Sequence, residues 1–85
     1  MAKKDAKVVV YTASWCAYCR AVKEYLRSRK VDFEEVDVEH DPKAAQAIVE
    51  KTKQAGIPVI EIGDETILGF DRQAIDGALR ENKLI

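Results

Sequence analysis

The chain has 85 residues, the size of one small domain, and 47% of them are hydrophobic, which is enough to form a core. Its 14 basic and 15 acidic residues leave a formal net charge of -1, so the composition excludes a strong single-sign field that would attract nucleic acid or an anionic membrane. Two cysteines are too few for the disulfide scaffold of a small secreted protein.

The first half of the chain reads as a strand, a helix and a second strand. We expect residues 1–6 to form a polar N-terminal tail and residues 7–85 to form one domain. A continuous apolar run predicts a buried strand over residues 7–11. Apolar residues at three- and four-residue steps then predict a helix from residue 17 to about residue 29, and a second strand follows over about residues 32–38. A strand, a helix and a strand in this length imply a parallel, right-handed crossover.

The second half predicts a helix, a hairpin and a last helix. Asp41 followed by proline is a good helix start, and this helix is expected over residues 42–53. Two strands are predicted over residues 56–62 and 65–68, joined by a tight Gly-Asp turn. A last helix is expected through residue 82, capped by Asp71. The predicted element order is therefore β-α-β-α-β-β-α.

The two cysteines, Cys16 and Cys19, lie at the predicted start of the first helix, after the loop that follows the first strand. Ser14 is a candidate N-cap of that helix. A thiol at a helix start meets unpaired N–H groups and the positive end of the helix dipole, which favour the thiolate that attacks disulfides. Between a strand and a helix, Cys-x-x-Cys is typical of a redox motif. Our hypothesis is a thiol–disulfide oxidoreductase with Cys16 as the nucleophile and Cys19 as the resolving thiol.

The cysteine pair and its neighbours also allow other interpretations. A structural zinc site needs four ligands, whereas this chain offers two thiols and the single His40, so no metal site is expected. His40, in a polar turn, is expected to be solvated. Arg20 and Lys23 either form a solvated helix face or help to stabilise a thiolate near Cys19. Trp15 and Tyr18 are either core aromatics or an apolar rim on which a disulfide substrate docks.

The expected cellular compartment is inferred from the absence of membrane-span and signal patterns in the sequence. No run reaches the roughly 20 apolar residues of a membrane span. No apolar signal region follows the basic first residues. We therefore expect a cytoplasmic monomer, without a nucleic-acid or membrane partner, in a reducing compartment where a lone cysteine pair is more often catalytic than structural.

Three motifs resemble those of glutaredoxins, which have the thioredoxin fold. They are residues 15–19 (Trp-Cys-Ala-Tyr-Cys), Ile57-Pro58 and residues 69–71 (Gly-Phe-Asp), and the resemblance extends over about residues 7–82 in matching order. It implies a four-stranded mixed sheet in the order 2-1-3-4, flanked by three helices, with the first and third on one face and the second on the other. It also implies that Pro58 follows a cis peptide bond and faces the disulfide.

The resemblance further implies a binding site for glutathione or a disulfide peptide. In glutaredoxins the motif tyrosine, the backbone before the cis proline and an aspartate near the last helix bind glutathione. Asp71 would take the γ-glutamyl ammonium, and helix-start N–H groups its carboxylate. The backbone of Ile57 would pair with the ligand as an added strand does. The implied binding residues are Trp15, Tyr18, Ile57, Pro58, Gly69, Phe70 and Asp71, with glutathione or a related thiol as co-substrate and no bound cofactor.

The chain departs from the glutaredoxin pattern at three places. Ala17 stands where the family usually has proline, Gly56 replaces a frequent threonine, and residues 12–15 lack the lysine that reaches the glycyl carboxylate of glutathione. Trp15, directly before the first cysteine, is instead similar to the tryptophan that thioredoxins and mycoredoxins have at this position. Gly69-Phe70 is similar to the glutaredoxin-like hydrogen donors of ribonucleotide reductase, some of which take electrons from thioredoxin reductase. The electron donor is therefore left open between glutathione, a related thiol and thioredoxin reductase.

A rival from another class is a carrier of a [2Fe–2S] cluster. Some glutaredoxins hold such a cluster between two protomers, using the first cysteine and glutathione, which here would be a role for Cys16. Those carriers more often have small residues where this chain has Trp15 and Tyr18. We therefore expect the disulfide oxidoreductase.

Overall fold

The computed structural model describes residues 7–54 and 56–85, and within them the predicted element order is confirmed. The predicted tail, residues 1–6, lies outside the described residues. The elements are β1 (Val8–Thr12), α1 (Ala17–Ser28), β2 (Glu34–Asp37), α2 (Pro42–Thr52), β3 (Val59–Ile62), β4 (Glu65–Leu68) and α3 (Arg72–Glu81). None of the helices in these two ranges is long and apolar enough to cross a membrane.

Two strands are shorter than the sequence indicates. β2 was expected to begin near residue 32 but begins at Glu34, and β3 was expected from residue 56 but begins at Val59. Proline has no N–H to donate to a strand ladder, so Pro58 ends the regular pairing of β3 on that side. Its carbonyl still accepts a hydrogen bond from the N–H of Gly69 at 2.9 Å, which holds the two loop segments together.

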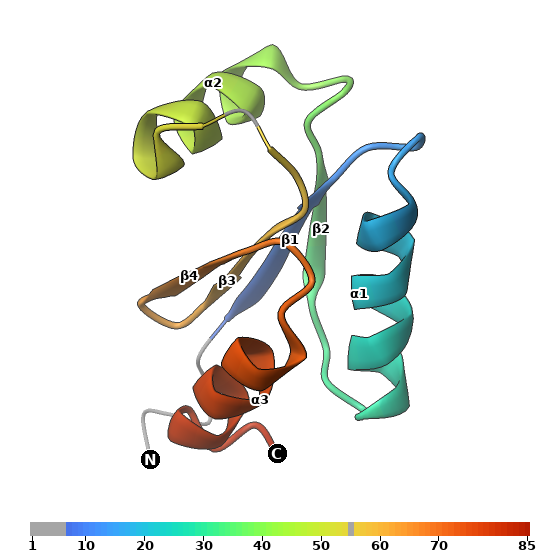
Figure 1. The fold of residues 1–85 in the computed structure, drawn as a ribbon, viewed down its shortest axis with the longest axis vertical. Coiled ribbons are helices and arrows are strands. Elements are labelled where there is room, and N and C mark those ends of the chain that lie inside the picture. The colour runs from blue at the N-terminus through green and yellow to red at the C-terminus, as the bar shows by residue number, and fades with distance from the viewer. Residues whose placement is uncertain (1–6, 55) are drawn as a thin grey trace.

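The four strands form one mixed sheet in the order β2-β1-β3-β4, as expected (Figure 1). β1 runs parallel to β2, with Val10 opposite Glu35. β1 is antiparallel to β3, with Val10 opposite Ile60, and β3 is antiparallel to β4, with Ile60 opposite Ile67. The predicted parallel crossover through α1 is therefore confirmed, and β1 lies in the middle of the sheet.

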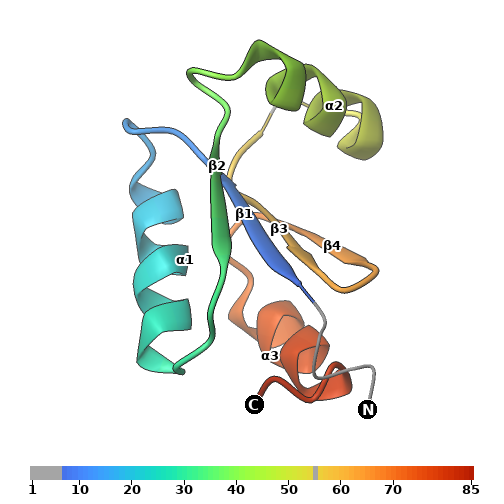
Figure 2. The ribbon, with the colours of Figure 1, turned by 180° about the vertical axis from the view of Figure 1, so that it is seen from behind.

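The two faces of the sheet are covered by different helices. Alternate residues of a strand point to opposite faces, and one set forms a core with α1 and α3. This core contains Val8, Val10, Val22, Leu26, Val31, Ile60, Ile62, Ile67, Ile75, Ala78 and Leu79. Glu61 points to the other face and pairs there with Lys51 of α2. Two opposite views show α2 set apart from both α1 and α3 (Figures 1 and 2).

Candidate functional site

Cys16 is the N-cap of α1. Its backbone is extended (φ -97°, ψ 109°), and its Sγ accepts a hydrogen bond from the backbone N–H of Cys19 at 3.1 Å. Sulfur therefore takes the place that a serine or aspartate oxygen takes in an ordinary cap. The prediction of Ser14 as the cap is wrong. Ser14 instead donates from its N–H and its Oγ to one carboxylate oxygen of Glu39, at 3.1 and 2.7 Å, which ties the loop before α1 to the loop after β2.

The two thiols have opposite surroundings. Both are free, but Cys16 is half-buried whereas only 1% of Cys19 is exposed. Burial, followed by the hydrogen bond with Cys16, raises the pKa of the Cys19 thiol to about 12. Within Ala17–Ser28, the first turn of α1 carries no acidic residue that would oppose negative charge on Cys16. A solution disulfide can therefore reach Cys16, while Cys19 lies behind it with its proton retained.

α1 explains why Cys19 is buried. Apolar residues recur along one side of this helix, and two of them, Val22 and Leu26, are completely buried against the sheet. Cys19 precedes them by three and seven residues and so belongs to the same inner side. Its Sγ lies 3.9 Å from the carbonyl oxygen of Tyr11, to which it donates.

A polar cavity of about 230 Å³ lies beside Cys16. Its lining consists of Thr12, Ala13, Ser14, Cys16, Arg20, Lys23, Glu35 and Asp37. The Glu35 carboxylate accepts hydrogen bonds from Lys23 Nζ at 2.8 Å and from Thr12 Oγ1 at 2.7 Å. These two bonds hold the pKa of Glu35 below its usual range. Sequence reasoning missed Thr12 and Glu35, although Thr12 lies two residues after Val10 and Glu35 two residues after Phe33, a spacing that places each on the same face of the sheet as that apolar residue.

A second cavity, of about 250 Å³, contains the predicted proline site. It is lined by Gln54, Gly56, Ile57, Pro58, Leu68 and Gly69. The Ile57–Pro58 peptide bond is cis, as the resemblance implied. Gly69 has a φ of +78°, which a glycine adopts without steric cost, and its N–H reaches the Pro58 carbonyl. The structure therefore brings Ile57, Pro58 and Gly69 together and adds Gln54 and Leu68 to them.

Trp15 and Tyr18 are exposed aromatics. Of the Trp15 surface 71% is exposed, and of the Tyr18 surface 68%, more than for any other large hydrophobic residue among those described. Of the two alternatives for these residues, core packing is therefore wrong. Exposed aromatic rings on both sides of a reactive cysteine in the chain offer apolar contact area to a partner.

Phe70 and Asp71 have structural contacts of their own. Phe70 is partly buried against the core, and its ring meets the Tyr25 ring edge-on, with centroids 6.1 Å apart. The Asp71 side chain accepts from the backbone N–H of Ala74 at 3.1 Å and so caps α3, as predicted. Asp71 is exposed, which leaves its carboxylate accessible to a ligand.

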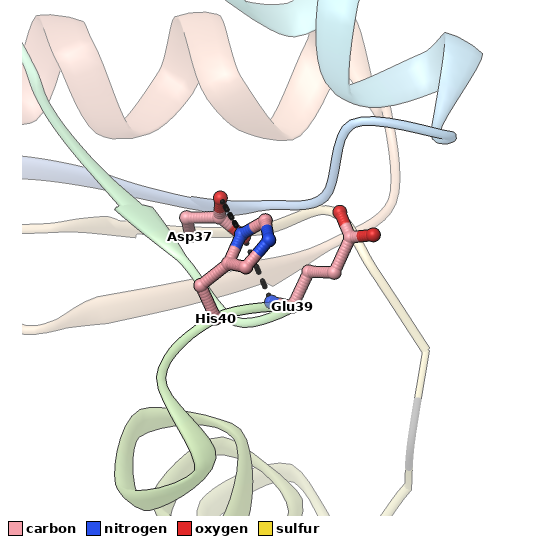
Figure 3. Close-up of side chains that lie close together, drawn as sticks. All are labelled: Asp37, Glu39 and His40. Atoms are coloured by element: carbon pink, nitrogen blue, oxygen red, sulfur yellow. Dashed lines mark hydrogen bonds and ion pairs between the residues drawn. The ribbon is translucent and has the colours of Figure 1, made fainter.

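His40 is exposed, as expected, and is paired with Asp37 (Figure 3). Its Nδ1 lies 2.8 Å from one Asp37 oxygen, and the other oxygen accepts from the backbone N–H of Glu39 at 2.8 Å. The hydrogen bond with Asp37 raises the pKa of His40, and the reciprocal bond lowers the pKa of Asp37. Figure 3 shows Glu39 extending toward the loop before α1, where it meets Ser14. This group organises the turn after β2.

Comparisons with known proteins agree with this geometry. Residues 8–67 match the family model described as glutaredoxin. The chain is 38% identical over 69 residues to an uncharacterised glutaredoxin-like 8.6 kDa protein in a rubredoxin operon of Clostridium pasteurianum, covering 81% of this chain and 92% of that protein. It is 33% identical over 64 residues to the glutaredoxin-like protein NrdH of Escherichia coli K12, covering 75% and 78% of the two chains.

Two solved structures show the same fold over most of the chain. NrdH-redoxin from Escherichia coli, described as having a thioredoxin-like activity profile, superposes with a TM-score of 0.77 at 31% identity, over 84% of this chain and 92% of that one. Methanoredoxin of Methanosarcina acetivorans superposes with a TM-score of 0.78 at 28% identity, over 86% and 83%. The family match includes Cys16, Cys19 and Pro58 and ends before Gly69.

Proposed function

The chain belongs to the glutaredoxin family, and on that premise we propose that it reduces disulfides of cytoplasmic proteins by dithiol exchange, with Cys16 as nucleophile and Cys19 as resolving thiol. The observation that carries this assignment is the asymmetry of the pair. The Cys16 sulfur accepts the Cys19 N–H at the start of α1 and is half-exposed, whereas the Cys19 thiol is buried. Only Cys16 is placed for attack on a bulky substrate.

The proposed reaction has two exchange steps. The Cys16 thiolate attacks one sulfur of the substrate disulfide, that bond breaks, and one half leaves as a thiolate. Cys19 then loses its proton to solvent and attacks Cys16 Sγ, which breaks the mixed disulfide and releases the second half. The substrate gains two electrons, and the cysteine pair becomes a disulfide. A reductant must then reduce that disulfide for the next cycle.

For the reductant we propose thioredoxin reductase as the main donor, with glutathione as the alternative. The likeness to NrdH-redoxin, whose activity profile is described as thioredoxin-like, supports this choice. So does the absence of a basic side chain from residues 12–15, which leaves the glycyl carboxylate of glutathione without that partner. Ribonucleotide reductase is a candidate substrate, because the Gly69-Phe70 motif resembles its glutaredoxin-like hydrogen donors.

Tyr18, Ile57, Pro58, Gly69 and Asp71 would bind the substrate. The cavity at Pro58 and Gly69 would hold its main chain beside Ile57. The accessible Asp71 carboxylate would attract a positive group on the ligand.

The test is an NADPH-coupled assay with a protein disulfide and, separately, a glutathionylated peptide. Each substrate is assayed once with thioredoxin reductase and once with glutathione plus its reductase. Cys16→Ser is expected to abolish every activity. Cys19→Ser is expected to abolish reduction of the protein disulfide and to spare deglutathionylation, in which a second glutathione closes the cycle. Substantial activity of Cys16→Ser would overturn the assignment of roles, and activity with glutathione alone would reverse the choice of donor.

The [2Fe–2S] alternative fits these residues less well. A cluster shared between protomers would bring two copies together at Cys16, where the exposed Trp15 and Tyr18 rings stand on either side of it in the chain. Protein purified without oxygen in the presence of glutathione is expected to be colourless. Visible absorption together with bound iron and sulfide would favour the carrier.

A further inference from the structure

The resolving step requires a proton to leave a buried thiol. Cys19 is 1% exposed, and burial is the main reason that its pKa is high. A thiol attacks only as the thiolate, so at neutral pH its fraction ionised limits the rate of resolution. Among the groups of the described residues that shift the Cys19 pKa, Lys23 is the cation, and its charge lowers the pKa of that thiol against the effect of burial.

Lys23 is built into the inner side of α1 rather than left free in solvent. It follows Cys19 by four residues, which places the two on the same side of the helix. Long helical side chains lean toward the N-terminus, so the Lys23 stem covers the turn that contains Cys19. Only 22% of its side chain is exposed, and its Nζ is held 2.8 Å from the Glu35 carboxylate.

Glu35 is itself fixed by a second hydrogen bond, from Thr12 Oγ1 at 2.7 Å. Thr12 is 2% exposed and ends β1, the strand whose Tyr11 carbonyl accepts from the Cys19 thiol. The three residues therefore form a chain across α1, β2 and β1. It forms part of the wall of the polar cavity that also opens on Cys16.

Among the described residues, the groups that act on Cys19 or line the neighbouring cavity do not include a second cation with a largely buried side chain. The groups that act on Cys19 are Cys16, the backbone of Ala13, Lys23 and the neutral Tyr11 carbonyl. The cavity beside Cys16 adds Thr12, Ser14, Arg20, Glu35 and Asp37. Arg20 is exposed. Lys23 is therefore the cation whose position the fold determines.

We propose that Lys23, anchored by Glu35 and Thr12, is a positioning residue that promotes ionisation of Cys19 in the resolving step. The proposal rests on the dithiol exchange proposed above. In that step the Cys19 proton goes to solvent, a bond forms between the two cysteine sulfurs, and the substrate sulfur leaves Cys16 as a thiolate. Lys23 stabilises the charge on Cys19 and is not itself consumed.

The step can be isolated with a chromogenic aryl disulfide in stopped flow. Attack by Cys16 releases a first coloured thiolate, and attack by Cys19 on the mixed disulfide releases a second. The rate of the second phase, measured against pH, reports the ionisation of Cys19. The Cys19→Ser variant should show the first phase alone and so identifies the second.

Lys23→Met is expected to slow the second phase at neutral pH at least about threefold, the size expected from one partly screened charge, and to move its pH profile to higher pH. Lys23→Arg, which retains the charge, should keep both the rate of the second phase and its pH profile close to those of wild type. Lys43→Met, the same change at an exposed lysine of α2, serves as the matched control and should behave as wild type. Glu35→Gln should slow the second phase as well, because the ammonium is no longer held.

The outcomes separate this inference from the function on which it rests. If wild type releases no second thiolate, Cys19 does not resolve the mixed disulfide and the proposed function fails. If wild type shows both phases but Lys23→Met has an unchanged second-phase pH profile, the function stands and the role of Lys23 is overturned. A second phase that is unchanged or faster in Glu35→Gln would overturn the anchoring role of Glu35.

Discussion

The backbone N–H of Cys19 donates a hydrogen bond to the Sγ of Cys16 at 3.1 Å. The backbone of Cys19 therefore stabilises the sulfur of Cys16, while the thiol of Cys19 donates to the Tyr11 carbonyl beneath the helix. Negative charge on Cys16 is favoured by this N–H and by the start of α1. Negative charge on Cys19 is opposed by burial. The division of labour within the pair follows from this one arrangement at the first turn of α1.

The position of the cysteine pair depends on the packing of α1 against the sheet. Leu26 is completely buried in the core that α1 shares with β1 and α3. Leu26→Ala should lower the free energy of unfolding by about 2–5 kcal/mol, because it removes buried methyl groups and leaves a cavity. Urea denaturation checks this value. Leu68→Ala, the same change at an exposed leucine, should lower the free energy of unfolding far less. Similar losses of stability in the two variants would contradict the core described here.

Asp71 has a structural role that can be separated from a binding role. It caps α3 through Ala74 N–H, so Asp71→Ala should lower the free energy of unfolding by about 1 kcal/mol. Asp71→Asn retains a capping oxygen and should be nearly as stable as wild type, but it removes the charge. If the carboxylate binds the γ-glutamyl ammonium, Asp71→Asn raises the KM for a glutathionylated peptide without a matching fall in kcat. An unchanged KM would leave Asp71 with its capping role alone.

Trp15 is expected to matter for substrate binding and not for folding. With 71% of its surface exposed it loses little packing on truncation, so Trp15→Ala should change the free energy of unfolding by less than about 0.5 kcal/mol. The KM for a protein disulfide should rise, because an aromatic contact surface is removed. Reduction of a small aliphatic disulfide serves as the control and should change less. A large loss of stability would mean that Trp15 packs in the folded protein.

The His40–Asp37 pair predicts a pH-dependent contribution to stability. The pKa of His40 is raised, so its contribution is present at low pH and is lost as the pH rises through the folded-state pKa of His40. The pKa of Asp37 is lowered, so its contribution is lost as the pH falls through the folded-state pKa of Asp37. His40→Ala should therefore lower the Tm at about pH 5.5 and leave it unchanged at about pH 9. An equal change in Tm at both pH values would contradict the charged pair.

The fold could be anticipated from local patterns because each element carries its own signal. The apolar run of β1, the helical spacing of α1, and the Asp41 and Asp71 caps all specify their elements without tertiary information. The Cys-x-x-Cys position at the end of a strand then locates the reactive pair.

What the sequence left unpredicted depends on packing. Ser14 and Cys16 both precede α1, and only the path of the loop, held by the contact of Ser14 with Glu39, decides which of them caps the helix. Glu35 lies in a strand of mostly acidic residues that resembles a solvated edge. Its pairing with Lys23 follows from the register of β2 beside β1, which places it opposite Val10 on the face that α1 covers.

The most direct test of the account is the alkylation of the two thiols by iodoacetamide, followed by mass spectrometry over a range of pH. Single-thiol variants Cys19→Ser and Cys16→Ser assign each rate, with glutathione as a free-thiol standard. In the folded protein Cys16, which is half-buried, is expected to be alkylated, and Cys19, which is 1% exposed, is expected to stay unmodified until the protein unfolds. Modification of Cys19 in the folded protein at a rate equal to or above that of Cys16 would contradict this asymmetry.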